Sequence, residues 1–228
     1  VSSELDDYSI EVIIADNASS DTSFSKAKQI KKTNPQINLL FYPLPDNIGF
    51  SAGNNQALKK SNPESKYVLF LNPDTIVEAD TFKKMLDFFQ HHPEVDSATC
   101  NLILALTGKT QPESHRGFPT PWNSFCHFFG FGLPKLFPKS KIFNGYFLGH
   151  LNYQKVQKID ACVGAFLMVK REVGETIGWW NEKYFFYGED LDFCYQLYQR
   201  EYKLYFNPHC QITHFQGISS GIKSLFGP

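Results

Sequence analysis

Residues 67–75 read YVLFLNPDT, an apolar run of five residues that stops abruptly at Asn72-Pro73-Asp74. Such a run predicts a strand buried on both faces of a sheet, and the proline ends it. A second run, over 10–15, ends at Asp16 and Asn17. Because ligands of α/β proteins bind at the carboxyl ends of the strands, these polar ends indicate a ligand site.

Around these two runs, strands alternate with helices. Further strands are predicted at 37–42, 96–103, 161–169 and from 204, and helices at 24–32, 51–60, 81–90 and 190–200. This alternation predicts an α/β fold, with a mostly parallel sheet and helices on both faces. We divide the single domain into 1–103, a proline- and aromatic-rich insertion at 104–158, and 159–228, because the middle part shows little periodicity.

Composition narrows the function classes. A formal net charge of −1 gives no electrostatic basis for binding nucleic acid. The five cysteines are scattered without metal-ligand spacing, which indicates structural thiols in a reducing compartment. No run approaches the roughly 18 apolar residues of a membrane span. The sequence is therefore that of a soluble or peripheral protein.

Two acidic positions are candidates for chemistry. Asp74 either binds a metal ion or caps the next helix, for which Asp80 is better placed. Glu189, Asp190 and Asp192 open a helix, where the helix dipole alone favours acids. Acids crowded beside aromatic residues also raise one another's pKa, which suits a general base.

Two weaker signals accompany these acids. Residues 47–55, NIGFSAGNN, form a glycine-rich turn into a helix, where phosphate can bind, but the spacing is neither a P-loop nor a dinucleotide fingerprint. His214 follows the last strand, and a lone histidine is more often structural than a metal ligand.

Six segments in this order resemble glycosyltransferase family 2, the inverting enzymes of the GT-A fold, and in particular its bacterial rhamnosyltransferase-like members. The segments are VIIADNASSD, NIGFSAGNN, YVLFLNPDT, DACVGAFLMVKREV, FFYGEDLDFCYQL and ITHFQGISS. The resemblance extends from Ile10 to about Ser220 and implies a Rossmann-like GT-A domain.

The resemblance also implies roles for the site residues. The positions that match the family's donor site bind the nucleotide-sugar: Asp16, Asn17, Asn47, Gly49, Asn54, Asn72 and Asp74. Asn72 and Asp74 take the place of the family's D-x-D motif, so that Asp74, with His214, holds Mg²⁺ or Mn²⁺. Asp190, with Glu189, supplies the catalytic base. Gly164 and Ala165 border the acceptor.

The implied reaction moves a sugar, rhamnose by likeness, from a nucleoside-diphosphate donor to a glycan or lipid-linked acceptor. Its setting is cell-surface polysaccharide synthesis in the cytoplasm, peripheral to the inner face of the membrane. Relatives have a strand and a helix before the segment that begins at Val12, so we expect an N-terminally truncated sequence whose strand at 10–15 lacks a sheet neighbour. Such a chain is expected to bind its donor poorly.

Two questions stay open at this stage. The aromatic residues of the insertion, with Lys135, Lys139 and Lys141, suit either inward packing or a membrane edge. We favour inward packing, because prolines interrupt an amphipathic helix. The alternatives to a transferase are a non-catalytic binding module derived from one and a sugar-phosphate nucleotidyltransferase, although the glycine-rich basic signature of the latter is missing from the sequence given.

Overall fold

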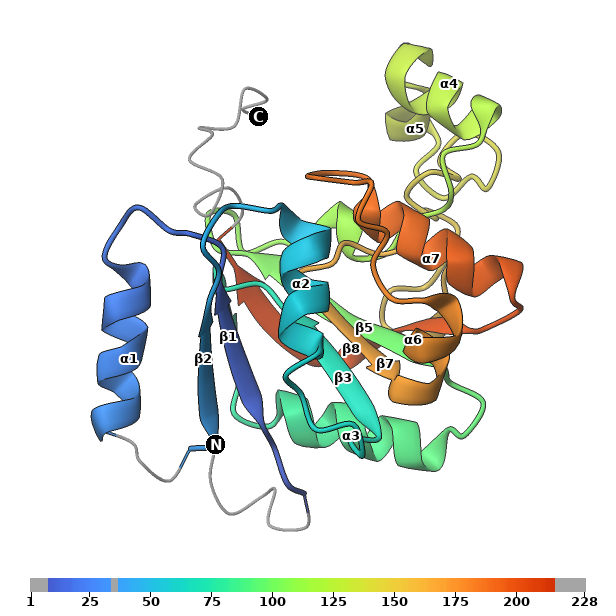
Figure 1. Cartoon of the computed structure of the whole chain (residues 1–228). Helices are drawn as coiled ribbons and strands as arrows, with labels where there is room; N and C mark the ends of the chain where they lie inside the picture. The colour runs from blue at the N-terminus through green and yellow to red at the C-terminus, as the bar shows by residue number, and fades with distance from the viewer. Residues whose placement is uncertain (1–7, 34–36, 216–228) are drawn as a thin grey trace.

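Two sheets form the framework of the protein in a computed structural model that describes residues 8–33 and 37–215 (Figure 1). The smaller sheet pairs β1 (Val12–Asp16) with β2 (Leu39–Pro43). The larger has the order β3-β7-β5-β8-β4, and β6 pairs with β8. Its strands are β3 (Tyr67–Leu71), β4 (Thr75–Val77), β5 (Ser97–Leu104), β6 (Gln157–Lys158), β7 (Phe166–Lys170) and β8 (Leu204–His214).

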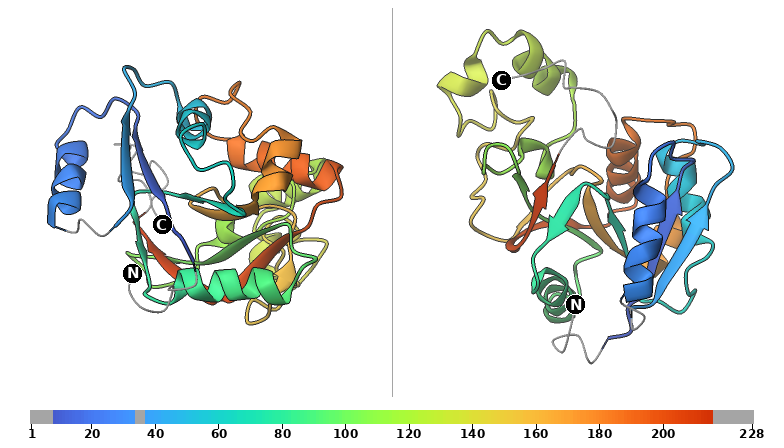
Figure 2. Two further views of the ribbon diagram at one scale, coloured as in Figure 1. Left: turned by 60° about the horizontal axis from the view of Figure 1, so that its bottom comes forward. Right: turned by 90° about the vertical axis from the view of Figure 1, so that its left-hand side faces the viewer.

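Helices lie on both faces of the larger sheet, as Figure 2 shows. α3 packs on one face, and α6 and α7 lie on the other. α1 stands beside the smaller sheet (Figure 1). The helices are α1 (Ser23–Thr33), α2 (Phe50–Leu58), α3 (Thr81–His91), α4 (Pro121–Phe129), α5 (Leu133–Leu136), α6 (Arg171–Ile177) and α7 (Glu189–Gln199), with a 3₁₀ turn at Pro112–Ser114.

The α/β class is confirmed, but strand pairing is more mixed than the alternation of strands and helices predicted. β1–β2 and β5–β8 are parallel, whereas β3–β7, β5–β7, β4–β8 and β6–β8 are antiparallel. β3 and β5 therefore run in the same direction, with β7 reversed between them. Two parallel neighbouring strands need a crossover connection, which is usually a helix. β7 instead follows the long 104–158 segment, whose path lets the strand run antiparallel to its neighbours.

β7 separates two hydrophobic cores. Leu167 and Val169 face a cluster that includes residues of α6 and α7, whereas Phe166 and Met168 face a cluster built on α3. This alternation follows from the period of two along a strand. Burial on both faces explains why β7 reads as a continuous apolar run.

β1 has a partner strand on one side only. Among the described residues it pairs with β2 and with no strand of the larger sheet. The sequence predicted that this strand lacks a neighbour, and this is confirmed for one of its two sides.

The insertion differs from the prediction of inward packing. α4 and α5 project away from both sheets (Figures 1 and 2), and Phe128, Phe129 and Phe131 are exposed. The argument from proline was wrong for α4, because Pro121 stands in the first turn, where proline is tolerated, and the Thr120 side chain caps the helix by accepting from Asn123 N.

The cysteines agree with a structural role. All five are free and buried. Within the described ranges, no helix combines the length and apolar character needed to cross a membrane.

Candidate active site

Asp74 and His214 meet at the end of the larger sheet. β4 begins at Thr75, which pairs in register with His214 of β8. Asp74, one residue earlier, thereby lies beside the histidine, with Oδ1 at 3.3 Å from Nε2. Both side chains are more than nine-tenths buried. Of the segment 212–220 that carries His214, residues 216–220 lie outside the described part.

Gln111 orients the histidine. Its buried Oε1 lies 2.7 Å from His214 Nδ1. An amide oxygen only accepts, so Nδ1 carries a proton toward Gln111, and Nε2 is the nitrogen that faces Asp74. Such a second partner on the far nitrogen is the usual support of a metal-binding histidine.

The Asp74–His214 pair fits a divalent cation. A carboxylate oxygen and an imidazole nitrogen 3.3 Å apart can share one ion when that nitrogen carries no proton. Among residues 8–33 and 37–215 no group of three or more His, Cys, Asp and Glu side chains could hold a metal. The described residues would offer this pair as ligands, and diphosphate oxygens and water could fill further positions.

Asp190 forms a buried ion pair. Gly188, in the left-handed region at φ 92°, precedes α7 and brings Glu189 and Asp190 into its first turn. Arg116 Nη2 donates to Asp190 Oδ2 at 2.7 Å, and the two side chains are 10% and 14% exposed. Leu191 N donates to the other carboxylate oxygen at 2.7 Å.

The surroundings of Glu189 and Asp190 shift the pKa of both side chains. Burial raises the pKa of Asp190 above its usual value, while the Arg116 cation and the backbone N–H groups of Leu191 and Gly164 lower it. Burial also raises the pKa of Glu189, whose Oε2 is buried without a hydrogen bond in the described structure. Raised carboxylate pKa values at one place are typical of a general base.

Backbone contacts place the acids Glu189 and Asp190 at the same end of the larger sheet as the Asp74–His214 pair. Asn72 N, just after β3, donates to Ala165 O at 3.0 Å. The adjacent Gly164 packs so closely that an added Cβ would lie 3.9 Å from Asp190 Cβ. The Ala165 side chain is fully buried, so it packs the core and presents no surface to an acceptor.

Asn17 ties the predicted nucleotide loops together. Its amide donates to Asn47 Oδ1 at 2.9 Å and to Gly49 O at 3.1 Å, and it accepts from Ile48 N at 3.0 Å. Gly49 adopts φ 86°, and a Cβ there would approach Phe185 O to 2.6 Å. Only glycine fits this close approach.

The other predicted donor residues lie nearby but make local contacts. Asp16 Oδ1 accepts from Ser19 N at 3.3 Å, at the end of β1. Asn54 donates to Phe50 O at 2.9 Å along α2, and Asn72 O accepts from the Thr75 hydroxyl at 2.7 Å. Their contact with a nucleotide stays a prediction.

Gln111 and Arg116 were missed because they lie in the segment without periodicity. Both fall in QPESHR, residues 111–116, a polar run after the strand that ends at Leu104. Polar residues after a strand were the signal that identified Asp16 and Asn72. Gln111 and Arg116 lie seven and twelve residues beyond Leu104, too far from the strand end for the same signal to find them.

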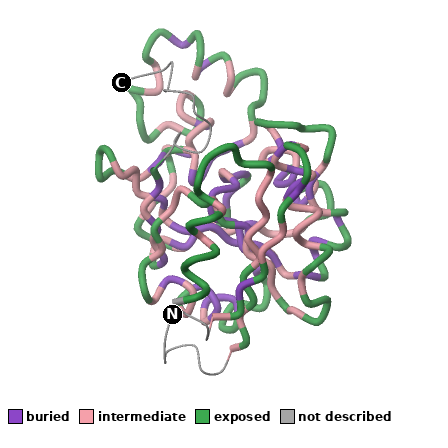
Figure 3. The backbone as a smooth tube through the Cα atoms, turned by 60° about the vertical axis from the view of Figure 1, so that its left-hand side comes forward, coloured by how far each residue is buried: buried purple, intermediate pink, exposed green. Residues whose placement is uncertain are grey.

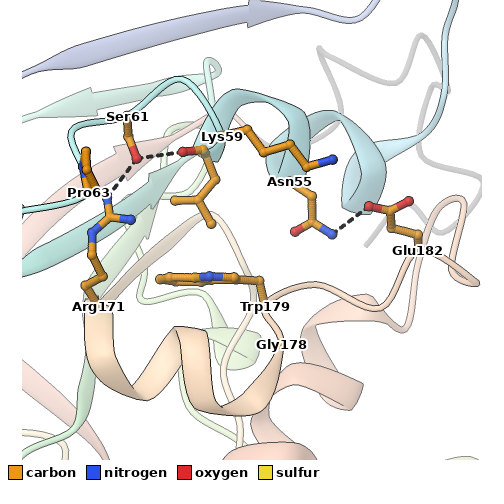
Figure 4. A pocket seen from close by; sticks show the side chains of 9 residues that line it. Asn55, Lys59, Ser61, Pro63, Arg171, Gly178, Trp179 and Glu182 are labelled. Atoms are coloured by element: carbon orange, nitrogen blue, oxygen red, sulfur yellow. Dashed lines mark hydrogen bonds between the residues drawn. The ribbon is translucent and has the colours of Figure 1, made fainter.

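A cavity of about 420 Å³ lies apart from these residues (Figure 4). Much of it is lined by Asn55 of α2, Lys59 just after that helix, Arg171, Trp179 and Glu182, and by none of the predicted site residues. Arg171 is occupied there, because it bonds to Ser61 Oγ at 2.7 Å and to Ser65 O at 3.0 Å. We place the site at the strand ends, where the titratable groups converge, and not in this cavity.

Comparison with known proteins gives the family. The model of glycosyl transferase family 2 matches residues 2–178. Rhamnosyltransferase WbbL of Escherichia coli (strain K12) is 27% identical over 173 residues, 73% of this chain and 61% of that protein. Low-salt glycan biosynthesis hexosyltransferase Agl10 of Haloferax volcanii is 26% identical over 82% of this chain and 52% of that protein. This chain thus spans less than two thirds of either relative.

Solved structures show the same fold. GalNAc-T7 with UDP, GalNAc and Mn²⁺ matches with a TM-score of 0.61 at 15% identity, over 90% of this chain and 37% of that one. Mannosyltransferase PcManGT of Pyrobaculum calidifontis, with GDP-Man and Mn²⁺, matches at 0.58 and 17% identity, over 92% and 50%. With the family model covering most of its length, this chain belongs to glycosyl transferase family 2.

Proposed function

We propose that the protein transfers a sugar from a nucleoside-diphosphate donor to an acceptor hydroxyl with inversion at the anomeric carbon. The observation that carries the proposal is the convergence of the Asp74–His214 pair and the buried Asp190 at one end of the sheet. The Asp74–His214 pair suits the diphosphate and its cation, and Asp190 suits the acceptor.

Asp190 is the proposed general base. It would take the proton of the acceptor hydroxyl as that oxygen bonds to the anomeric carbon and the carbon–oxygen bond to the diphosphate breaks. Arg116 would keep the carboxylate ionised before the reaction, and burial would make it basic enough to accept the proton. A single displacement needs no nucleophile from the protein.

Asp74 and His214 are the proposed ligands of Mg²⁺ or Mn²⁺. A bound cation would offset the charge that develops on the departing diphosphate. The presence of Mn²⁺ in GalNAc-T7 and in the mannosyltransferase of Pyrobaculum calidifontis supports this assignment.

For the donor sugar we propose rhamnose, supported by the likeness to WbbL, and for the acceptor a glycan or a lipid-linked sugar of cell-surface polysaccharide synthesis. We place the reaction in the cytoplasm, at the inner face of the membrane. Five buried free thiols are in keeping with a reducing compartment.

Thermal unfolding tests the donor site. The chain is heated with UDP, GDP, dTDP and their sugars, with and without MnCl₂. A ligand at a hundred times its Kd adds ~2.7 kcal/mol of stability, which raises the Tm of a chain of this size by roughly 5–10 °C. We expect one nucleotide to act, only with Mn²⁺, and to lose its effect in Asp74→Ala.

Asp80→Ala is the matched control, because Asp80 is a nearby acid whose side chain is 44% exposed and pairs with Lys84. It should leave the nucleotide shift unchanged. If Asp74→Ala keeps the full metal-dependent shift, the proposed donor site is wrong.

A further inference from the structure

The segment from Gly117 to Leu151 carries an aromatic surface that no described residue covers. The part that contains α4 and α5 stands clear of both sheets (Figures 1 and 2), and Figure 3 shows most of it as exposed. Phe128, Phe129 and Phe131 expose 69%, 65% and 101% of their surface. We call the following set the aromatic surface: Trp122, Phe125, Phe128, Phe129, Phe131 and Leu136.

α4 turns its aromatic side outward. Trp122 stacks on Phe125, with ring centroids 5.7 Å apart, and Phe125 stacks on Phe129 at 6.4 Å. On the other side Cys126 is buried, and His127 stacks on Tyr146 at 4.6 Å. Helices of soluble domains normally bury their apolar stripe, so an outward row of stacked rings marks a binding surface.

The segment is also basic. From Gly117 to Leu151 the sequence holds three lysines and no Asp or Glu, in a chain whose net charge is −1. The three, Lys135, Lys139 and Lys141, are exposed within or just after α5. The positive charge of these exposed lysines favours an anionic partner.

We propose that the aromatic surface binds the face of an anionic lipid bilayer. Its rings would enter the interface between headgroups and acyl chains, and Lys135, Lys139 and Lys141 would contact lipid phosphates. A segment that combines exposed rings with exposed lysines and contains no acids fits this partner better than an acidic protein, which offers charge but no apolar layer for six large side chains.

The position of the surface connects it with the candidate active site. Arg116, the partner of Asp190, is five residues before the first residue of α4. Binding would therefore hold Asp190 close to the membrane, where a lipid-linked acceptor is presented. This consequence rests on the proposed function, whereas lipid binding itself does not.

Vesicle co-sedimentation of the whole chain tests the proposal. The vesicles are phosphatidylcholine alone or mixed with phosphatidylglycerol, at about 20 mM and about 500 mM salt, which shortens the Debye length severalfold. We expect binding to the mixed vesicles that weakens with salt. The triple variant K135Q/K139Q/K141Q should bind on the order of a hundredfold more weakly, since each lysine near the surface contributes about fivefold.

The triple variant F128S/F129S/F131S should lose binding by about tenfold or more per inserted ring. Matched controls change exposed residues elsewhere: K26Q/K32Q/K183Q for charge, and I30S/I76S/L106S for apolar area. These should bind as the parent does. Because the lysine variant removes no packed group, it keeps the test decisive even where the aromatic variant folds poorly.

Three results would overturn the proposal. The first is no binding to mixed vesicles at low salt. The second is unchanged binding in both triple variants of the segment. The third is dimerisation of the parent in sedimentation velocity without lipid that F128S/F129S/F131S abolishes, since the surface would then join two copies of the chain. None of these results depends on nucleotide binding, so they are independent of the test of the donor site.

Discussion

Replacing Arg116 by methionine should destabilise the protein in a way that depends on pH. Arg116 and Asp190 are 2.7 Å apart and almost fully buried. The substitution keeps most of the side-chain volume but removes the cation. Asp190 is then a buried ionised carboxylate without a cationic partner, which is among the most costly arrangements in a protein.

The size of the effect follows from the burial. Breaking a buried ion pair by removing one member costs about 3–5 kcal/mol, and 1 kcal/mol shifts the Tm of a 150–250-residue protein by about 2–4 °C. We therefore expect a loss of roughly 6–20 °C at pH 8. Burial already raises the pKa of Asp190, and Arg116 is the main influence that opposes it.

The sign of the pH dependence is fixed by that pKa. Without Arg116, the folded-state pKa of Asp190 rises further above the usual value of 3.8, so the folded state holds its proton to higher pH than the unfolded chain. Stability is then retained at low pH and lost as pH rises through the raised pKa. The gap in Tm between parent and variant should be narrower at pH 4.5 than at pH 8, by roughly 5 °C or more.

Thermal unfolding by circular dichroism at both pH values measures this gap, and Arg171→Met is the control. Arg171 is equally buried, but it bonds mainly to the neutral oxygens of Ser61 and Ser65, and its carboxylate partner Glu175 is 56% exposed. Its loss should cost stability to a similar degree at both pH values. If Arg116→Met behaves like this control, Arg116 does not govern the ionisation of Asp190.

Three further outcomes are expected. Asp190→Asn should lower the transfer rate by about 10²–10⁴-fold in a radiolabelled-sugar assay while keeping the nucleotide-induced Tm shift; normal turnover would remove Asp190 from the role of base. Gln111→Ala should raise the MnCl₂ concentration needed for that shift about 10–100-fold, and an unchanged Mn²⁺ titration would refute the orienting role. Gly49→Ala should lower the Tm well beyond Gly108→Ala, because both glycines have positive φ but only Gly49 has a neighbour, Phe185 O, within 3 Å of an added Cβ. Equal losses would show that the close approach does not matter.

The sequence predicted those parts of the fold that depend on local pattern. The apolar run at 67–71 and its stop at Asn72 gave β3 with both its bounds, and α3 was placed within a residue of its end. The antiparallel insertion of β7 could not be predicted, since it depends on the path of the 104–158 segment. α4 was missed because proline was taken as a helix breaker, although Pro121 lies in the first turn.

Local pattern also singled out the two acids of the candidate site, whereas the role of His214 came only from the resemblance. Asp74, His214 and Asp190 stand at strand or helix ends, which the pattern of apolar runs reveals. Their partners Gln111 and Arg116 are 103 and 74 residues away in the sequence. Such pairs are set by how the segment at 111–116 packs against β8 and α7, and no local periodicity records that packing.

The separation of the two sheets has a consequence for the order in which the protein opens. Asp16 and Asn17 belong to the β1–β2 unit, whereas Asp74, His214 and Asp190 belong to the larger sheet, and within the described residues no ladder hydrogen bond joins the two. The smaller unit should therefore exchange its amide hydrogens through a sub-global opening that leaves the larger sheet intact. A donor that contacts both units would suppress this sub-global opening. Slower amide exchange along β1 and β2 would then report nucleotide binding, even at amides that do not touch the nucleotide.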